Sequence, residues 1–119
     1  MTNAAMVQIS YHPQFLKDLK RLNKRYKSLK HDFECLLTEL SSNPNLGIDL
    51  GHGVRKVRMA ISSKGKGKSA GARIITFKRI QITAESFQLV LLSVYDKSEI
   101  ANVSDRYIQS LIESLSDSY

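Results

Sequence analysis

The segment from Val54 to Arg79 constrains this chain more than any other, because it combines dense positive charge with the apolar spacing of strands. It holds nine of the 18 lysines and arginines, and no acidic residue lies between Asp49 and Glu85. The apolar residues among the charges predict two strands joined by a loop rich in glycine, lysine and serine. These apolar residues are Val57, Met59, Ile61, Ile74, Ile75 and Phe77.

Alternation within the two strands predicts which charges share a face. Lys56 and Arg58 alternate with apolar residues in the strand 54–61, so they point away from the side that those residues bury. Arg73 takes the equivalent place in the strand 72–79. We therefore expect one face of the sheet to stay uncovered and to gather polar side chains. The residues expected there are Lys56, Arg58, Arg73, Ser93, Tyr95 and Lys97.

The rest of the chain predicts one α+β domain spanning residues 1–119. Residues 6–10 alternate like a short strand, two apolar stripes of helical spacing follow, and residues 43–53 (NPNLGIDLGHG) have the composition of a loop. The apolar run 87–95 predicts a buried strand, and Ser104 predicts the start of a last helix. The predicted fold is β-α-α-β-β-β-α, a mainly antiparallel four-stranded sheet with helices packed on one face.

The charge favours a polyanionic partner. A net charge of +7 and a pI near 9.7 suit nucleic acid, although a solvated basic surface needs no partner. Gly67-Lys68-Ser69 matches the end of a P-loop, but the first glycine is missing and a strand follows where a helix is needed. We expect the loop lysines to contact RNA phosphates instead; a mobile, solvated loop is the competing interpretation. The predicted RNA- or ribosome-binding residues are Arg55, Lys64, Lys66, Lys68, Lys78 and Arg79.

Several classes of protein are disfavoured. No apolar run approaches the roughly 20 residues that span a bilayer, so no membrane partner is expected. The single cysteine excludes an internal disulfide, and residues 1–10 lack the pattern of a secretory signal, so we expect a cytoplasmic protein. No Cys, His and Asp cluster has metal-ligand spacing, and neither a metal nor another cofactor is expected.

Cleavage of RNA needs neither a metal nor a histidine, because the 2′-hydroxyl of RNA is itself the nucleophile. His12 and His31 are expected to be solvated, and His52 is a minor candidate for moving protons. Clustered cations can offset charge that develops on the phosphate, and Lys56 among arginines could act as a base. Tyr95 could stack on a base or donate a proton, or simply end a strand.

Two segments together resemble the RelE/HigB-type toxins of bacterial type II toxin-antitoxin systems. They are RKVRMAISSKGKGKSAGARIITF and LVLLSVYDKSEIANVS, within residues 53–104. The resemblance implies a RelE-like microbial-RNase fold and a ribosome-dependent endoribonuclease that cleaves translated mRNA. It also implies a cognate antitoxin that neutralises the protein, in a toxin-antitoxin hetero-oligomer.

Carried over by position, the resemblance assigns the catalytic site to Lys56, Arg58, Arg73, Tyr95 and Lys97. The late tyrosine of some members has no counterpart, because its place falls near Val103, so the acid-base role passes to Tyr95 or to no residue. Two rival functions stay open. One is a non-catalytic RNA-binding or antitoxin-pairing protein of the same fold. The other is nonspecific DNA binding, for which no helix-turn-helix pattern is visible.

Overall fold

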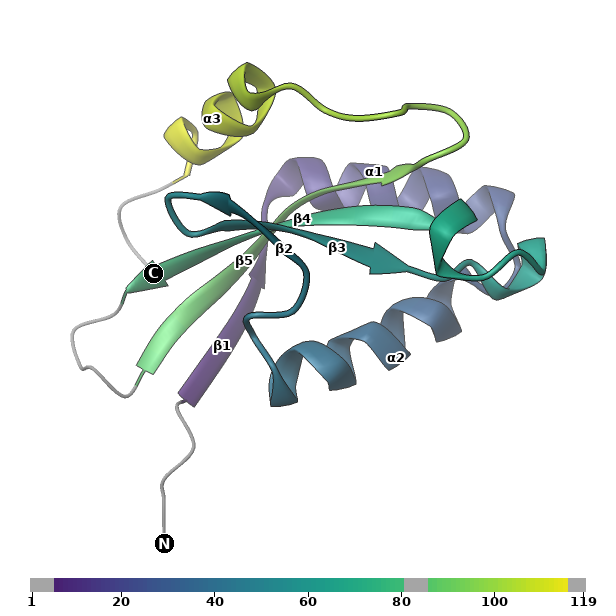
Figure 1. Ribbon diagram of the computed structural model, residues 1–119, viewed down its shortest axis with the longest axis horizontal. Coiled ribbons are helices and arrows are strands. Elements are labelled where there is room, and N and C mark those ends of the chain that lie inside the picture. The colour runs from purple at the N-terminus through teal and green to yellow at the C-terminus, as the bar shows by residue number, and fades with distance from the viewer. Residues whose placement is uncertain (1–5, 81–85, 116–119) are drawn as a thin grey trace, which may run out of the picture.

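The computed structural model describes residues 6–80 and 86–115, which form three α-helices and a five-stranded mixed sheet (Figure 1). In chain order the elements are β1 (Met6–Tyr11), α1 (Pro13–Arg25), α2 (Leu29–Ser42), β2 (Ile48–Gly51), β3 (Val54–Met59), β4 (Ala72–Ile80), β5 (Ser86–Asp96) and α3 (Asp105–Glu113). The α+β class is as predicted. None of the helices in the described ranges is long and apolar enough to cross a membrane.

The sheet has the strand order β1-β5-β4-β3-β2, with β1 parallel to β5 and the other three neighbouring pairs antiparallel. The prediction of four strands was wrong, because β2 lies in the segment assigned to a loop. All four β2 residues are exposed, so no apolar alternation marks the strand. The β2–β3 turn is His52-Gly53, whose φ angles of 54° and 83° suit a tight two-residue hairpin.

The prediction that all helices pack on one face was also wrong. Helices α1 and α2 bury one face of the sheet, whereas α3 packs against the other, the α3 face (Figure 1). The core under α1 and α2 includes Phe15, Leu22, Leu36, Leu40, Val57, Met59, Ile74, Leu91 and Val94. The core under α3 includes Val54, Ile75, Val90, Leu92, Tyr95, Ile108 and Leu111. The face expected to be open is therefore partly covered.

Helix α1 begins at a capping residue that sequence reasoning assigned to solvent. His12 is buried, with 7% of its surface exposed. Its Nδ1 accepts a hydrogen bond from the Gln14 backbone N–H at 2.9 Å, and its Nε2 lies 2.7 Å from the Ser114 hydroxyl. His12 thus caps α1 and connects it to the end of α3. The predicted cap of α3 is confirmed, because the Ser104 hydroxyl accepts from Tyr107 N–H.

An irregularity in β5 determines which side chains reach the α3 face. Ile75 pairs with Ser93 whereas the next residue, Thr76, pairs with Leu91, so Leu92 is the extra residue of a bulge. Leu91 and Val94 consequently both face α1 and α2, while Leu92 and Tyr95 both face α3. The bulge thereby places Tyr95 on the same face as Arg73, its partner across the strands.

The start of β4 requires glycine. A Cβ added to Gly71 would lie 2.2 Å from the Met59 carbonyl oxygen and 3.0 Å from the Ile61 nitrogen. We expect Gly71→Ala to lower the free energy of unfolding by about 1–3 kcal/mol, because two backbone segments would have to separate. Urea denaturation measures this loss. Gly65→Asn is the control, since Gly65 has open space and a left-handed φ of 68° that asparagine tolerates. Equal midpoints for the two variants would contradict the expectation.

Candidate nucleic-acid interface

Three basic side chains come together on the α3 face at one end of the sheet. Arg58 of β3 pairs with Arg73 of β4, which pairs with Tyr95 of β5. Lys56 lies two residues before Arg58 and shares its face. We call Lys56, Arg58 and Arg73 the cationic cluster. The predicted gathering of these residues on one face is observed. Their exposure differs, however: Arg58 is exposed, Lys56 is half-buried and Arg73 is only 5% exposed.

Arg73 holds the β3–β4 loop against the sheet. Its guanidinium donates hydrogen bonds of 3.1 Å to the carbonyl oxygens of Lys68, Ser69 and Ala72. Burial lowers the pKa of Arg73 and the nearby charge of Arg58 lowers it further, while Tyr95 acts in the opposite direction. The guanidinium nonetheless stays charged at neutral pH. No carboxylate within residues 6–80 and 86–115 forms an ion pair with any member of the cluster.

Tyr95 is a buried neutral phenol beside this charge. It is 2% exposed, and burial raises its pKa although Arg73 opposes the rise. Asn102, in the segment before α3, joins it to the cluster: its Oδ1 accepts from Lys56 Nζ at 3.2 Å and lies 3.4 Å from the Tyr95 hydroxyl. Sequence reasoning missed Asn102, because it lies in a connecting segment with no repeating pattern. A protonated Tyr95 can donate a proton but cannot act as a base at neutral pH.

Lys64, predicted to bind RNA, instead forms an ion pair and hydrogen bonds within the protein. Its ammonium lies 2.6 Å from Oδ1 of Asp96, which is fully buried, and also donates to Ala70 O and Ser98 Oγ. Burial would lower the pKa of Lys64, but the hydrogen bond and charge of Asp96 raise it above its ordinary value. Lys64 therefore stays charged and attaches the loop to the end of β5.

A second buried carboxylate attaches the other side of this loop. Asp32 of α2 accepts hydrogen bonds from the backbone and hydroxyl of Ser62 and from the Ser28 hydroxyl. Burial would raise the pKa of Asp32, but these hydrogen bonds lower it, so the group stays ionised. The loop that composition suggested was mobile is thus held at Asp32, Arg73 and Asp96.

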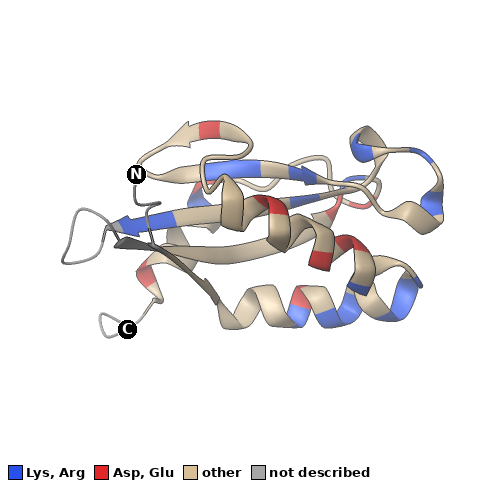
Figure 2. Ribbon diagram, turned by 90° about the horizontal axis from the view of Figure 1, so that it is seen from below, with Lys and Arg blue, Asp and Glu red and all other residues tan. Residues whose placement is uncertain are grey.

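Lysines and arginines are spread over helices, strands and loops (Figure 2), and the other predicted contact residues lie in separate places. Lys66 and Lys68 are exposed on the loop, and Lys68 lies 4.0 Å from Glu39. Lys97 is exposed beyond β5, where its backbone N–H bonds to Gly71 O at 3.1 Å and extends the β4–β5 ladder. Both Lys66 and Lys97 are thus near the cluster's end of the sheet.

The remaining basic residues do not join the cluster. Arg55 lies on the opposite face of β3 and donates to Gly47 O at 3.0 Å, with Asp49 at 3.7 Å. Lys78 lines a cavity with Arg55, and Arg79 is half-buried near the far end of β4. His52, in the β2–β3 turn, is at the other end of β3 from Arg58. We find no single surface that contains all six predicted RNA-binding residues.

Chemistry at the cluster rests on cations, one phenol and an amide. In the part of the chain that the structure describes, no three His, Cys, Asp or Glu side chains are grouped closely enough to hold a metal ion. The cationic cluster with Tyr95 and Asn102 can bind an anion and donate a proton to it.

A search against models of known protein families finds no match to this chain.

Proposed function

We propose that this protein is a metal-independent endoribonuclease that cleaves translated mRNA on the ribosome, as its resemblance to RelE/HigB-type toxins implies. A cognate antitoxin would neutralise it. The observation that carries the proposal is the cationic cluster, in which three strands and a loop hold Lys56, Arg58 and Arg73 beside Tyr95. No carboxylate of the described residues neutralises this charge, so a phosphate is a suitable ligand.

In the proposed reaction the 2′-oxygen of the RNA attacks the adjacent phosphorus and the bond from phosphorus to the 5′-oxygen breaks. Arg58 offsets the negative charge that develops on the phosphoryl oxygens, and Lys56 adds its charge once it has taken up the 2′-proton. Arg73 contributes its charge without direct contact to the phosphate, because its guanidinium already donates hydrogen bonds to three carbonyl oxygens. Tyr95 donates the proton that the leaving 5′-oxygen takes up, and a base, for which Lys56 is the candidate, accepts the 2′-proton.

One observation favours the rival function, an RNA-binding or antitoxin-pairing protein without catalysis. Tyr95 and Arg73 are 2% and 5% exposed, and a substrate must touch a group that transfers its proton. The exposed residues Arg58, Lys66 and Lys97 would suffice for binding alone. Catalysis therefore requires that Asn102 turns away from the Tyr95 hydroxyl when RNA binds.

The experiment that separates these functions is induction of the protein in a bacterial host with mapping of mRNA 5′ ends. New ends confined to translated regions, together with slowed growth, would support the ribonuclease. A folded protein that slows no growth and creates no new ends would favour the binding function. New ends spread equally over untranslated regions would contradict the dependence on the ribosome.

Salt should weaken RNA binding steeply. We expect the logarithm of the binding constant for a short single-stranded RNA to fall linearly with the logarithm of salt concentration, with a slope of about −2 to −3. This slope corresponds to roughly three or four phosphate contacts, as Lys56, Arg58 and exposed loop lysines would make. Fluorescence anisotropy between 50 and 300 mM salt, about a sixfold range, measures it. A flat response would show that the cationic cluster does not contact phosphate.

A further inference from the structure

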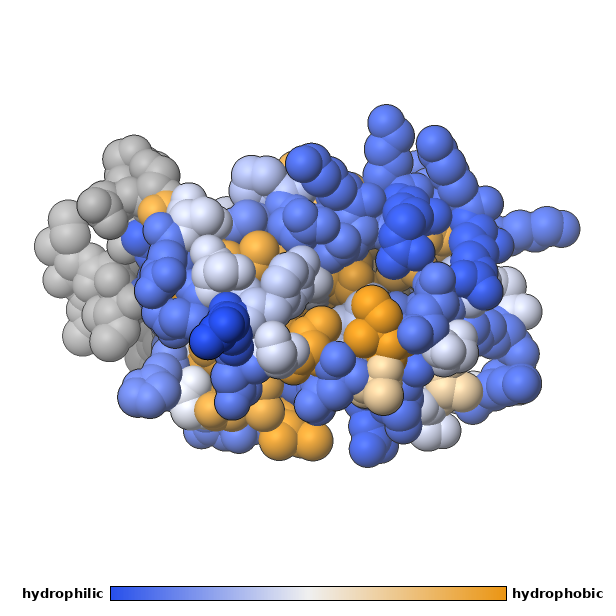
Figure 3. All heavy atoms as spheres, turned by 90° about the horizontal axis from the view of Figure 1, so that it is seen from above, coloured by the Kyte–Doolittle hydropathy of each residue, from blue (hydrophilic) through white to orange (hydrophobic). Residues whose placement is uncertain are grey.

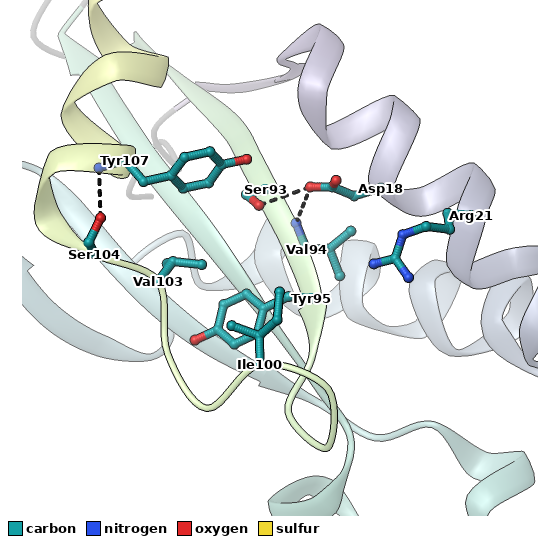
Figure 4. Close-up of a pocket in the computed structure, with 9 residues that line it drawn as sticks. All are labelled: Asp18, Arg21, Ser93, Val94, Tyr95, Ile100, Val103, Ser104 and Tyr107. Carbon is teal, nitrogen blue, oxygen red and sulfur yellow. Dashed lines mark hydrogen bonds between the residues drawn. The ribbon is translucent and has the colours of Figure 1, made fainter.

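A pocket of about 270 Å³ has Tyr95, the neighbour of the cationic cluster, in its wall (Figure 4). It is formed by α1, the end of β5, and the segment that leads into α3. Tyr95 belongs to both places, because it lines the pocket and pairs across the strands with Arg73. If the phosphate of a ligand lies on the cationic cluster, the chemical group attached to that phosphate can therefore reach the pocket.

The walls of the pocket suit a flat, largely apolar ring. Two tyrosines, Tyr95 and Tyr107, line it together with Val94, Ile100 and Val103. On the face drawn in Figure 3, apolar patches lie among hydrophilic side chains. Aromatic and branched side chains with a few fixed polar groups are typical of small-ligand pockets, and tyrosines commonly contact nucleobases.

Asp18 supplies a fixed carboxylate, and Arg21, Ser93 and Ser104 are further polar residues of the pocket wall. Its Oδ1 accepts from Gln14 Nε2 at 2.9 Å, and its Oδ2 accepts from the Ser93 hydroxyl at 2.9 Å and the Val94 N–H at 3.2 Å. The strand β1 ends opposite Leu91, so it cannot accept a hydrogen bond from the Val94 N–H further along β5. Asp18 accepts that hydrogen bond instead. A carboxylate offers about four acceptor sites, and the described residues use three of them. One acceptor site on Oδ1 is left for a ligand donor.

The hydroxyl of Tyr107 lies near this carboxylate (Figure 4). Burial raises the pKa of Tyr107, Ser93 opposes the rise, and the negative charge of Asp18 adds to it. The phenol is therefore neutral at physiological pH. The polar end of the pocket thus presents a carboxylate acceptor beside a neutral hydroxyl.

We propose that this pocket binds a nucleobase with an exocyclic amino group and discriminates against uracil. The amino N–H donates to Asp18 Oδ1, while the ring lies against Tyr95 and Val103. Uracil has a carbonyl oxygen where cytosine has its amino group, so uracil would place an acceptor against the carboxylate. Because the phosphate is assigned to the cationic cluster, this pocket assignment rests on the proposed function.

The test is an NMR titration of the ¹⁵N-labelled protein with cytidine and uridine 5′-monophosphates. Their bases differ at C4, where an amino group replaces a carbonyl oxygen, and at N3, which accepts in cytosine and carries an N–H in uracil. We expect both nucleotides to shift the amide signals of Arg58 and Arg73. Cytidine monophosphate should also shift those of Val94 and Tyr107 and bind about 3- to 10-fold more tightly, as one hydrogen bond allows. In Val103→Phe, which fills the pocket, the two nucleotides should bind equally.

The outcomes distinguish the pocket from the proposed function. Shifts at Arg58 and Arg73 alone, for both nucleotides, would refute the pocket and leave the phosphate contact standing. Shifts at Val94 and Tyr107 alone would support the pocket and refute the phosphate contact. Equal affinity for the two nucleotides in the wild-type protein would refute the discrimination, and this comparison needs no variant to fold. No shifts at either place would refute both.

Discussion

The double variant Lys56→Ala/Arg58→Ala is expected to cleave ribosome-bound mRNA about 100-fold more slowly than the wild-type protein, or slower still, while keeping its fold. Removing one preorganised donor from a catalytic site typically costs about 10²- to 10³-fold in rate, and solvent screening at an exposed residue such as Arg58 reduces that effect. The fold should survive because neither side chain belongs to a core. Single-turnover cleavage rates and circular dichroism measure the two effects.

A matched control for this variant is Lys17→Ala/Lys24→Ala. Both lysines are exposed on α1 and in no ion pair that the described residues form, so the control removes the same two charges from a chain of net charge +7. The control is expected to keep its rate within about threefold, because both of its charges are exposed and screened by salt. A similar loss in both double variants would mean that total charge, not the cationic cluster, drives activity.

Arg58 is a better test residue than Arg73. The sequence predicts Arg73 on an uncovered face, where its replacement by alanine would remove only a charge. In the structure Arg73 donates to three carbonyls, two of them in the β3–β4 loop. Its removal would release that loop as well as remove a charge. Lost activity in Arg73→Ala would then have two causes, whereas Arg58 donates no hydrogen bond to residues 6–80 or 86–115.

The second large effect is on stability. Asp96→Asn is expected to lower the free energy of unfolding by about 3–5 kcal/mol, because it leaves the Lys64 ammonium in a partly buried place without its carboxylate. Asp96 also accepts hydrogen bonds from Tyr26 and Ser98, of which an amide can satisfy only part. The melting temperature should fall by roughly 10 °C or more. Glu34→Gln, at an exposed position on α2, is the control and should change little. An Asp96→Asn protein as stable as this control would contradict a structural role for the pair.

The same carboxylate should make stability depend on acid pH. Burial would raise the pKa of Asp96, but hydrogen bonds from Lys64, Tyr26 and Ser98 hold it well below its ordinary value. Because the folded-state pKa is the lower one, the group adds stability above about pH 4 and loses it as pH falls further. The wild-type protein should therefore lose more free energy of unfolding than Asp96→Asn between about pH 5 and pH 2. Parallel curves for the two proteins would contradict the assignment.

Much of the sheet was predictable because side chains alternate along strands. Lys56 and Arg58 fall on the face opposite Val57 and Met59, as expected from period-two spacing. The sequence analysis did not predict that α3 covers the other face of the sheet, although the residues of β4 indicate it. Ile75 and Phe77 share the side of Arg73, and apolar residues on both sides of β4 indicate that both faces are packed.

Other features could not be predicted from local patterns. Lys64 and Asp96 are 32 residues apart, and nothing in a glycine-lysine loop indicates that one lysine turns inward to a carboxylate. The strand β2 has only exposed residues, so no hydrophobic pattern marks it. Asp18 joins the pocket because β1 ends early and leaves the Val94 N–H of β5 without a strand partner. These are consequences of tertiary packing.

The most direct test of the proposed ribonuclease is cleavage by purified protein of one short mRNA, free or bound to ribosomes with a sense codon in the acceptor site. Rapid cleavage of the bound mRNA, little or none of the free mRNA, and a rate at least about 100-fold lower in Lys56→Ala/Arg58→Ala are expected. If the folded wild-type protein binds these ribosomes but leaves the mRNA intact, the protein is not a ribosome-dependent ribonuclease, and the cationic cluster serves binding alone.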